Sequence, residues 1–217
     1  MLSLLALSLA ANGATLRWVP AGPGDWDTTS NRWDIDGSGP ILPTPWTQKD
    51  AAIFDGVLSG EVNVVSPIEA SRVIFESDGY ILAGGPLTMI EQNPGDFVDF
   101  VAQAGVTGTV NAEIVSPGDL WVNFFGETGT VVFGGDNSYA DKTSVRGGVL
   151  ELGGTLGSTV IDVEKDATLR LSSAGRLDNS AVLTSGALAP GGTVELNGDE
   201  TVSLFNSSGL LNGAGTL

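Results

Sequence analysis

Residues 134–152 read GGDNSYADKTSVRGGVLEL, and this stretch has the pattern of one turn of a repeating β structure. A polar Asn-Ser-Tyr corner precedes a short Thr-Ser-Val strand, a Gly-Gly turn and the alternating segment Val149–Leu152. Alternation of apolar and polar residues predicts a half-buried strand, and the flanking glycines predict turns. The stretch therefore predicts shape and gives no sign of catalytic chemistry.

The closing phrase of this stretch returns downstream. Gly-(Val/Thr)-Leu-x-Leu begins at Gly148, and related phrases begin at Ala167, Gly192 and Gly215. A spacing of about 20 residues is typical of a solenoid, in which each coil stacks on the one before. We therefore predict an all-β solenoid. A β-sandwich or jelly roll is the alternative, but it does not need the same phrase to return in register.

Short alternating segments separated by turn residues predict further strands along the chain. No window of helical length keeps apolar residues at the helical period, so we predict little or no helix. The predicted strands are Thr15–Trp18, Ala51–Phe54, Glu61–Val65, Ser71–Phe75, Gly79–Ala83, Leu87–Ile90, Phe97–Ala102, Gly108–Val115, Leu120–Phe124 and Gly129–Phe133.

The segment 19–46 differs from the rest because it combines prolines with tryptophans. Its prolines predict an absence of regular strand pairing. We predict that residues 15–56 form a Trp-rich N-terminal cap over the end of a solenoid that occupies residues 57–217, with an incomplete last coil. The alternative is a carbohydrate-binding module that uses Trp26 and Trp33, because flat rings suit sugar faces.

Residues 1–14, MLSLLALSLAANGA, look like a secretion signal. The uncharged run Leu2–Ala11 is too short to span a bilayer as a helix, and Ala11 or Ala14 would suit cleavage. A positive n-region is missing, and a buried first strand or helix is the alternative. No later segment is long and apolar enough to cross a membrane. We therefore expect an exported protein.

Composition excludes several classes of function. The formal net charge of −17 should repel nucleic acid and anionic membranes, so we expect neither as a partner. The absence of Cys and His removes thiol nucleophiles, disulfides, imidazole bases and the usual zinc ligands.

The remaining motifs predict no catalytic, cofactor-binding or metal-binding residues. The run Asp34-Ile35-Asp36-Gly37-Ser38-Gly39 begins like a calcium loop, but Pro45 stands where the bidentate acid would be. Glycosidases and lyases use paired acids, and the chain has three such pairs. Lyases also need basic partners, and the lysines lie in turns with no shared motif. We therefore expect no enzyme, with a polysaccharide-degrading β-helix as a further alternative. The acid pairs are Asp25/Asp27, Asp50/Asp55 and Asp96/Asp99, and the lysines are Lys49, Lys142 and Lys165.

The stretch that decides the fold resembles the autotransporter-associated β-strand repeat, roughly G-x-N-x-Y-x-G-x-T-x-V-x-x-G-x-L-x-L. The matching residues are Gly134–Tyr139, Thr143–Val145 and Gly147–Leu152, and the chain departs from the repeat at Asp141. The resemblance extends to the N-terminal half, through the segments at 25–33, 51–56 and 77–85.

This resemblance implies a secreted or cell-surface bacterial protein, folded as a right-handed parallel β-helix with a passenger or stalk role, and it implies no activity or cofactor. We expect an exported structural or adhesin module. Its expected partners are cell-surface or extracellular polysaccharides, other matrix proteins, or further copies joined end to end. The chain stops within the recurring phrase at Gly215-Thr216-Leu217, so a fragment of a longer protein is also expected.

Overall fold

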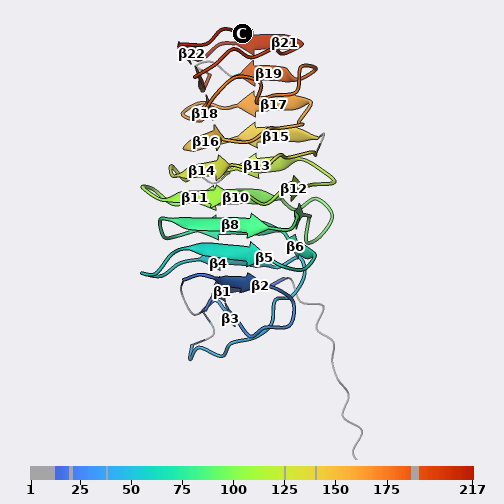
Figure 1. Ribbon diagram of the computed structural model, residues 1–217, viewed down its shortest axis with the longest axis vertical. Helices are drawn as coiled ribbons and strands as arrows, with labels where there is room; N and C mark the ends of the chain where they lie inside the picture. Colours follow the sequence, from blue (N-terminus) through green and yellow to red (C-terminus); the bar gives the residue numbers. More distant parts are fainter. Residues whose placement is uncertain (1–12, 20–21, 38, 125, 140, 187–190) are drawn as a thin grey trace, which may run out of the picture.

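The computed structural model describes residues 13–19, 22–37, 39–124, 126–139, 141–186 and 191–217. Within these residues the protein is built of strands and turns and contains no helix. Figure 1 shows the strands stacked one above another along a single long axis, from β1–β3 at one end to β21 and β22 at the other. This confirms the prediction of an all-β chain.

Sheet A holds ten of the strands. It runs in the order β21-β19-β17-β15-β13-β10-β7-β4-β1-β3, and every pairing is parallel except that of β1 with β3. Its strands are β1 (Thr15–Trp18), β3 (Trp33–Ile35), β4 (Ala51–Phe54), β7 (Arg72–Phe75), β10 (Asp99–Ala102), β13 (Leu120–Val122), β15 (Lys142–Val145), β17 (Val160–Val163), β19 (Val182–Ser185) and β21 (Leu204–Ser207).

Sheets B and C hold the other strands, all in parallel pairs. Sheet C ends at β12, and single parallel bridges through Asn137, Leu156 and Leu177 follow further along the chain. Sheet B comprises β2 (Gly24–Trp26), β5 (Glu61–Val64), β8 (Tyr80–Gly84), β11 (Thr107–Val110), β14 (Thr130–Phe133), β16 (Val149–Leu152), β18 (Thr168–Leu171), β20 (Thr193–Leu196) and β22 (Leu210–Gly213), and sheet C comprises β6 (Ile68–Ala70), β9 (Leu87–Met89) and β12 (Ile114–Val115).

From β4 to β13 the chain passes repeatedly through sheets A, B and C, and from β13 on its strands alternate between sheets A and B; each new strand pairs with the strand one pass earlier. We call each such pass a coil. Stacked parallel strands of this kind are consistent with a β-solenoid. They contradict the sandwich alternative, whose sheets would be antiparallel.

The core forms where the inward residues of each coil stack on those of the next. Most strands alternate between buried and half-buried positions, as expected for sheets with one face inside. In sheet B one buried ladder runs through seven coils at Val62, Leu82, Val110, Phe133, Leu152, Leu171 and Leu196. The recurring phrases at 148, 167 and 192 are therefore in register, as the sequence predicts.

The fourth phrase, at Gly215, is a wrong prediction. The coil above β20 is supplied by β22, in which Leu210 pairs with Thr193. Gly215-Thr216 follows that strand and lies over an earlier corner, where Glu200 N donates to Thr216 O at 2.9 Å. A three-residue phrase matched the repeat, but the hydrogen-bond register placed it elsewhere.

Two further expectations about strands are corrected. The predicted strand Gly108–Val115 is two strands, β11 and β12, separated by a corner at which Asn111 N and Ala112 N both donate to Leu82 O. The proline-rich segment does contain strands, β2 and β3. Each has three residues and lies at the edge of its sheet, where a neighbouring proline is tolerated.

Buried asparagines hold neighbouring coils together at their corners. Asn123 accepts from Ala102 N at 2.8 Å and donates to Gly129 O and Gly147 O at 3.1 and 3.2 Å. Gly148, beside it, has φ of 52°, and a Cβ there would lie 2.2 Å from Gly129 O. Only glycine fits such an approach without strain.

Candidate ligand-binding face

The tryptophans of the N-terminal segment lie inside the protein. Trp18, Trp26, Trp33 and Trp46 are each at most 3% exposed. Trp33 contacts the other three rings and Trp26 also contacts Trp46, with centroids 4.7 to 5.1 Å apart. Three of these rings, all but that of Trp46, have centroids within 6.0 Å of the Phe54 centroid. Buried rings cannot stack on a sugar. The carbohydrate-binding alternative on Trp26 and Trp33 is therefore wrong in its location, and these rings stabilise the first coils.

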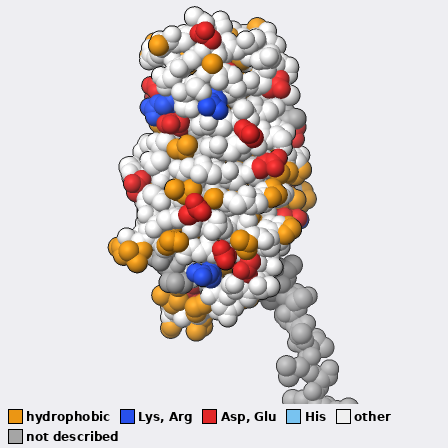
Figure 2. All heavy atoms as spheres, viewed as in Figure 1, with side chains coloured by type: hydrophobic (Ala, Val, Ile, Leu, Met, Phe, Trp, Pro, Cys, Tyr) orange, Lys and Arg blue, Asp and Glu red, His pale blue; other side chains and the backbone are white. Residues whose placement is uncertain are grey.

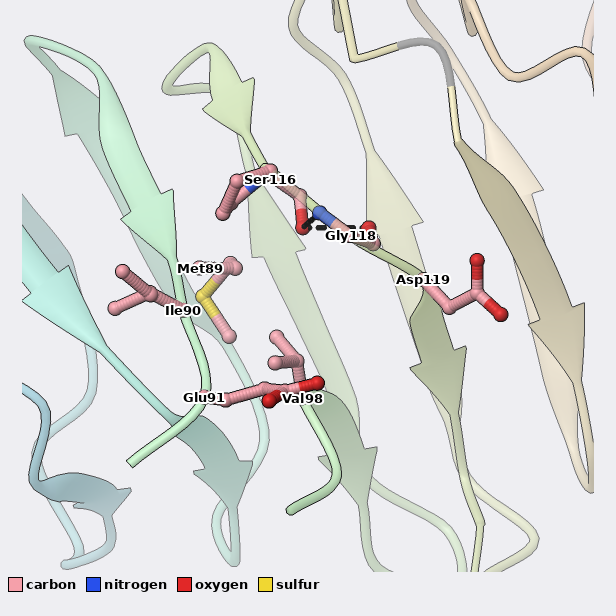
Figure 3. Close-up of a pocket in the computed structure, with 8 residues that line it drawn as sticks. Met89, Ile90, Glu91, Val98, Ser116, Gly118 and Asp119 are labelled. Atoms are coloured by element: carbon pink, nitrogen blue, oxygen red, sulfur yellow. Dashed lines mark hydrogen bonds between the residues drawn. The ribbon is translucent and has the colours of Figure 1, made fainter. Parts of the chain in front are cut away.

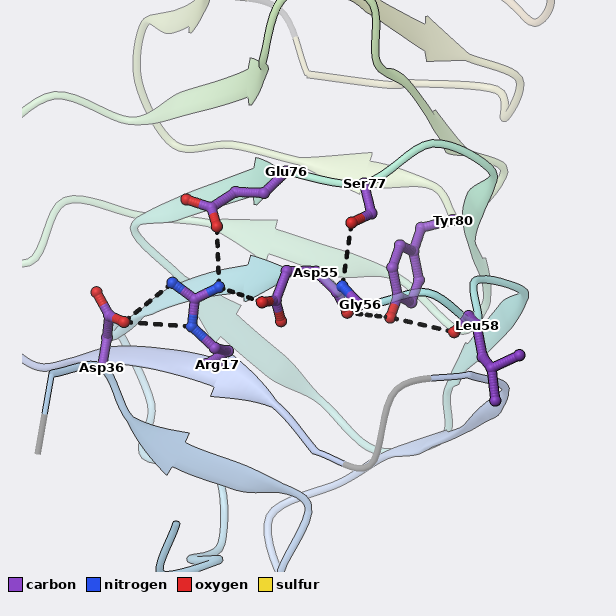
Figure 4. A network of polar contacts seen from close by, with 8 residues as sticks. All are labelled: Arg17, Asp36, Asp55, Gly56, Leu58, Glu76, Ser77 and Tyr80. Carbon is purple, nitrogen blue, oxygen red and sulfur yellow. Dashed lines mark hydrogen bonds and ion pairs between the residues drawn. The ribbon is translucent and has the colours of Figure 1, made fainter. Parts of the chain in front are cut away.

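The acids near this segment are engaged in structural contacts. Arg17 of β1 lies among three carboxylates, with Nη2 3.0 Å from Asp36 and Nη1 2.5 Å from Asp55 and 2.8 Å from Glu76 (Figure 4). Tyr80 Oη donates to Asp55 O at 2.6 Å in the same network. These contacts join three successive coils and leave Asp55 as part of a cross-coil ion cluster.

Of the other acids predicted in this part of the chain, Asp25 is exposed in β2, whereas Asp27 and Asp50 have local partners. Burial favours a higher pKa at Asp27, but hydrogen bonds from Ser30 and Thr29 outweigh it and lower the pKa to about 2. Burial raises the pKa of Asp50, whose Oδ1 accepts from Ala14 N at 2.8 Å. These are turn and corner contacts and form no catalytic pair.

The calcium-like run begins in strand β3 with Asp34 and Ile35 and continues into a turn at Asp36 and Gly37. Asp34 is buried and accepts from Leu42 N at 2.8 Å, while Asp36 binds Arg17. Ser38 lies outside the described residues, as do residues 1–12 of the predicted leader. Among the residues that the structure describes, no cluster of three or more acids could hold a metal ion.

An exposed group of aromatic rings lies on the outer side of sheet A, and we call it the ring cluster. Phe97, Trp121 and Phe124 have centroids 4.1 to 4.6 Å apart. Phe97 is 44% exposed, and Trp121 points outward because its neighbours in β13 point into the core. The Arg146 guanidinium lies 4.6 Å from the Trp121 ring centroid and pairs with Glu164.

Asp99 is buried beside the ring cluster. It occupies an outward position of β10, in register between Arg72 and Trp121, yet its side chain is 0% exposed. Its Oδ2 lies 3.5 Å from Arg72 Nη2 and 3.4 Å from Phe124 N, while no described residue donates to Oδ1. Burial raises the pKa of Asp99 to about 7, with Arg72 acting in the opposite direction.

Two cavities of about 230 Å³ each flank the loop between β9 and β10, which carries Phe97. The first lies between Met89–Glu91, Val98 and the corner Ser116–Asp119 (Figure 3), where Ser116 Oγ donates to Gly118 O at 2.8 Å. The second is lined by Ser71, Arg72, Gln92, Asp96 and Phe97. The second cavity therefore places one aromatic ring beside four polar or charged side chains.

The loop between the cavities is ordered by hydrogen bonds within itself and by one to Lys49. Asn93 donates through N and Nδ2 to Asp96 Oδ2, at 2.9 and 2.8 Å. Gly95 N donates to Glu91 Oε2 at 2.8 Å, and Gln92 Nε2 donates to Lys49 O at 3.0 Å. The loop is therefore preorganised, which lowers the entropic cost of binding a ligand.

The sequence predicts this face only in part. Asp96 and Asp99 form one of the predicted acid pairs, whereas Phe97, Trp121 and Phe124 belong to no predicted site. Alternation along the strand could have predicted the exposed position of Trp121. Leu120 and Val122 point into the core, so the tryptophan between them faces outward.

The chain is similar to part of the Adhesin BmaC autotransporter of Brucella suis biovar 1 (strain 1330). The two are 30% identical over 177 residues, which cover 79% of this chain and 5% of that protein. The chain thus spans a small part of that relative's length. No family model and no solved structure matches. The similarity agrees with the predicted resemblance to autotransporter proteins, without reaching the specific repeat.

Proposed function

We propose that the chain is an exported structural module displayed at a bacterial cell surface, as a stalk or adhesin segment of the autotransporter-passenger type. The observation that carries this proposal is the stacking of parallel strands in register along one axis, in sheets of ten and nine strands. Similarity to part of an autotransporter adhesin supports the same class.

The stacking gives such a module its mechanical role. Backbone hydrogen bonds between coils run along the axis, so each coil supports the next and the rod resists bending. Figure 2 shows acidic side chains scattered over the visible face with few basic ones, in line with the net charge of −17. A dispersed charge of one sign keeps a rod soluble and separate from its neighbours.

We further propose that the coils form a right-handed β-helix built from autotransporter-associated β-strand repeats. The crossover connection between parallel strands of one sheet is almost always right-handed. The repeat residues also have fitting roles: Asn137 accepts from Ile114 N and donates to Thr155 O, so it ties three coils. The buried Tyr139 is hydrogen-bonded to Thr143, with 2.9 Å between Tyr139 Oη and Thr143 Oγ1.

The proposal includes no catalytic activity. Five of the six predicted acids are engaged in corner contacts and ion pairs. Two of the lysines pair with acids, Lys142 with Asp162 and Lys165 with Asp166, and Lys142 begins strand β15 and does not lie in a turn as predicted. Among the described residues, no helix has the length and apolar character needed to cross a bilayer. Export and anchoring are part of the proposal, with residues 1–14 as the export signal.

Surface labelling tests the proposed function. Antibodies raised against the purified chain should bind intact cells of the source bacterium, and external protease should remove the signal. Labelling that requires permeabilised cells would contradict surface display. Release of reducing ends or unsaturated sugars from polysaccharides by the purified chain would contradict a purely structural role.

A further inference from the structure

The cavity beside Phe97 combines the two features that a sugar ring requires. A pyranose has an apolar C–H face and a rim of hydroxyl groups. Phe97 supplies an exposed ring as one wall, backed by Trp121 at 4.2 Å between centroids. The volume of about 230 Å³ is below the roughly 300–1,000 Å³ of drug-sized pockets, so it suits one ring-sized unit.

The polar wall offers acceptors that the fold leaves available. Gln92 donates through Nε2 to Lys49 O, and Asp96 accepts through Oδ2 from Asn93 within the loop. Among the described residues, no hydrogen-bond donor contacts Gln92 Oε1 or Asp96 Oδ1. Both atoms belong to side chains that line the cavity. Two fixed acceptors beside an aromatic wall can receive hydroxyl protons at the ring's edge.

Charge selects a neutral ligand. The cation of this cavity, Arg72, faces the buried carboxylate of Asp99 at 3.5 Å, and Asp96 adds a further negative group. The whole chain carries a net charge of −17, so an acidic saccharide would meet net repulsion. Hydroxyl groups avoid this cost and match the acceptors.

We propose that this cavity binds one ring of a neutral saccharide, which makes the ring cluster the recognition surface of the module. The proposal rests on the proposed function for its biological setting, since a surface-displayed rod meets glycans. Its chemistry depends only on Phe97, Gln92 and Asp96. The N-terminal tryptophans take no part because they are buried.

Fluorescence and NMR titrations test the proposal. The purified chain is titrated with neutral oligosaccharides of glucose, galactose, mannose and N-acetylglucosamine, and with oligogalacturonate as the charged comparison. We expect binding of a neutral sugar that changes the emission of Trp121. Phe97→Ala and Asp96→Asn should each weaken it about tenfold, the effect of one lost aromatic or polar contact. Phe97→Trp should retain binding.

The controls separate binding from folding. Val57→Ala removes a side chain that is 98% exposed at a different corner, and it should leave affinity unchanged. Trp121→Phe should abolish the emission change while saturation-transfer NMR still detects the sugar. The proposal fails if no neutral sugar binds at about 1 mM, if oligogalacturonate binds better, or if the Phe97 and Asp96 variants bind normally while folded. Surface labelling is independent of all three outcomes.

Discussion

The buried carboxylate of Asp99 should make the protein less stable as the pH rises, and Asp99→Asn should remove that loss. The side chain is 0% exposed, and Oδ1 has no donor among the described residues. The facing charges are Arg72, which favours ionisation, and Glu127, which opposes it. An amide at this position keeps the shape and carries no charge.

The magnitude follows from the pKa. Burial raises the pKa of Asp99 from 3.8 to about 7, and each pKa unit is worth about 1.4 kcal/mol. The upper limit is therefore roughly 4 kcal/mol. Between the two values the folded state binds the proton and the unfolded state does not. The contribution of protonated Asp99 to the free energy of unfolding is thus fully present below about pH 4 and is lost as the pH rises through about 7.

Urea unfolding at pH 4, 5, 6, 7 and 8 measures this effect. The other acids also change repulsion with pH, so the informative quantity is the difference in unfolding free energy between Asp99→Asn and the unmodified chain. We expect the variant to gain roughly 1–4 kcal/mol at pH 8 and nothing at pH 4. A difference that stays constant across this range would refute the reasoning, because it would mean that Asp99 does not titrate there.

Three further substitutions, one of them with a matched control, test how the coils are held together. Asn123→Ala should lower the free energy of unfolding in urea by roughly 2–4 kcal/mol, because three backbone groups of neighbouring coils lose their buried partner. A loss no larger than that caused by substituting an exposed residue would contradict the linking role. Gly108→Ala should lower the free energy of unfolding by about 1–3 kcal/mol, because its Cβ would lie 2.1 Å from the buried Phe75 ring. The control Gly118→Ala, with open space around the new Cβ, should leave stability unchanged. Equal melting temperatures for the two variants would contradict close packing at Gly108. Arg170→Met should lower the free energy of unfolding by less than about 1 kcal/mol, and by less still in high salt, because its ion pairs with two glutamates are partly exposed. A large loss of stability that does not depend on salt would contradict this.

Much of the fold follows from local pattern. The alternation in Val149–Leu152 and its return in β18 and β20 predict strand, register and stacking together, because a strand with one buried face allows a single register. The phrase at Gly215 shows the limit. Its three residues match the repeat, but the preceding segment already supplies the next strand at Leu210.

The candidate site depended on contacts between distant segments. The sequence marks Trp26 and Trp33 as large rings in an irregular segment, but burial depends on whether another element closes over them, and Trp46 and Phe54 do so. Conversely, Asp99 lies in an outward position that alternation assigns to solvent. It is buried where the Arg72 side chain and the turn at Phe124, from segments before and after it in the chain, contact its carboxylate.

Disulfide trapping tests the stacked parallel register most directly. The chain has no cysteine, so introduced pairs are the sole thiols. Thr168 and Thr193 are partners in adjacent parallel strands, whereas Thr168 and Glu195 are offset by two residues on the same face. Adjacent strands lie about 4.8 Å apart, within the usual Cα separation of a disulfide, while the offset pair exceeds it. We predict rapid oxidation of Thr168→Cys/Thr193→Cys and little of Thr168→Cys/Glu195→Cys; the reverse order would contradict the stacked-coil fold.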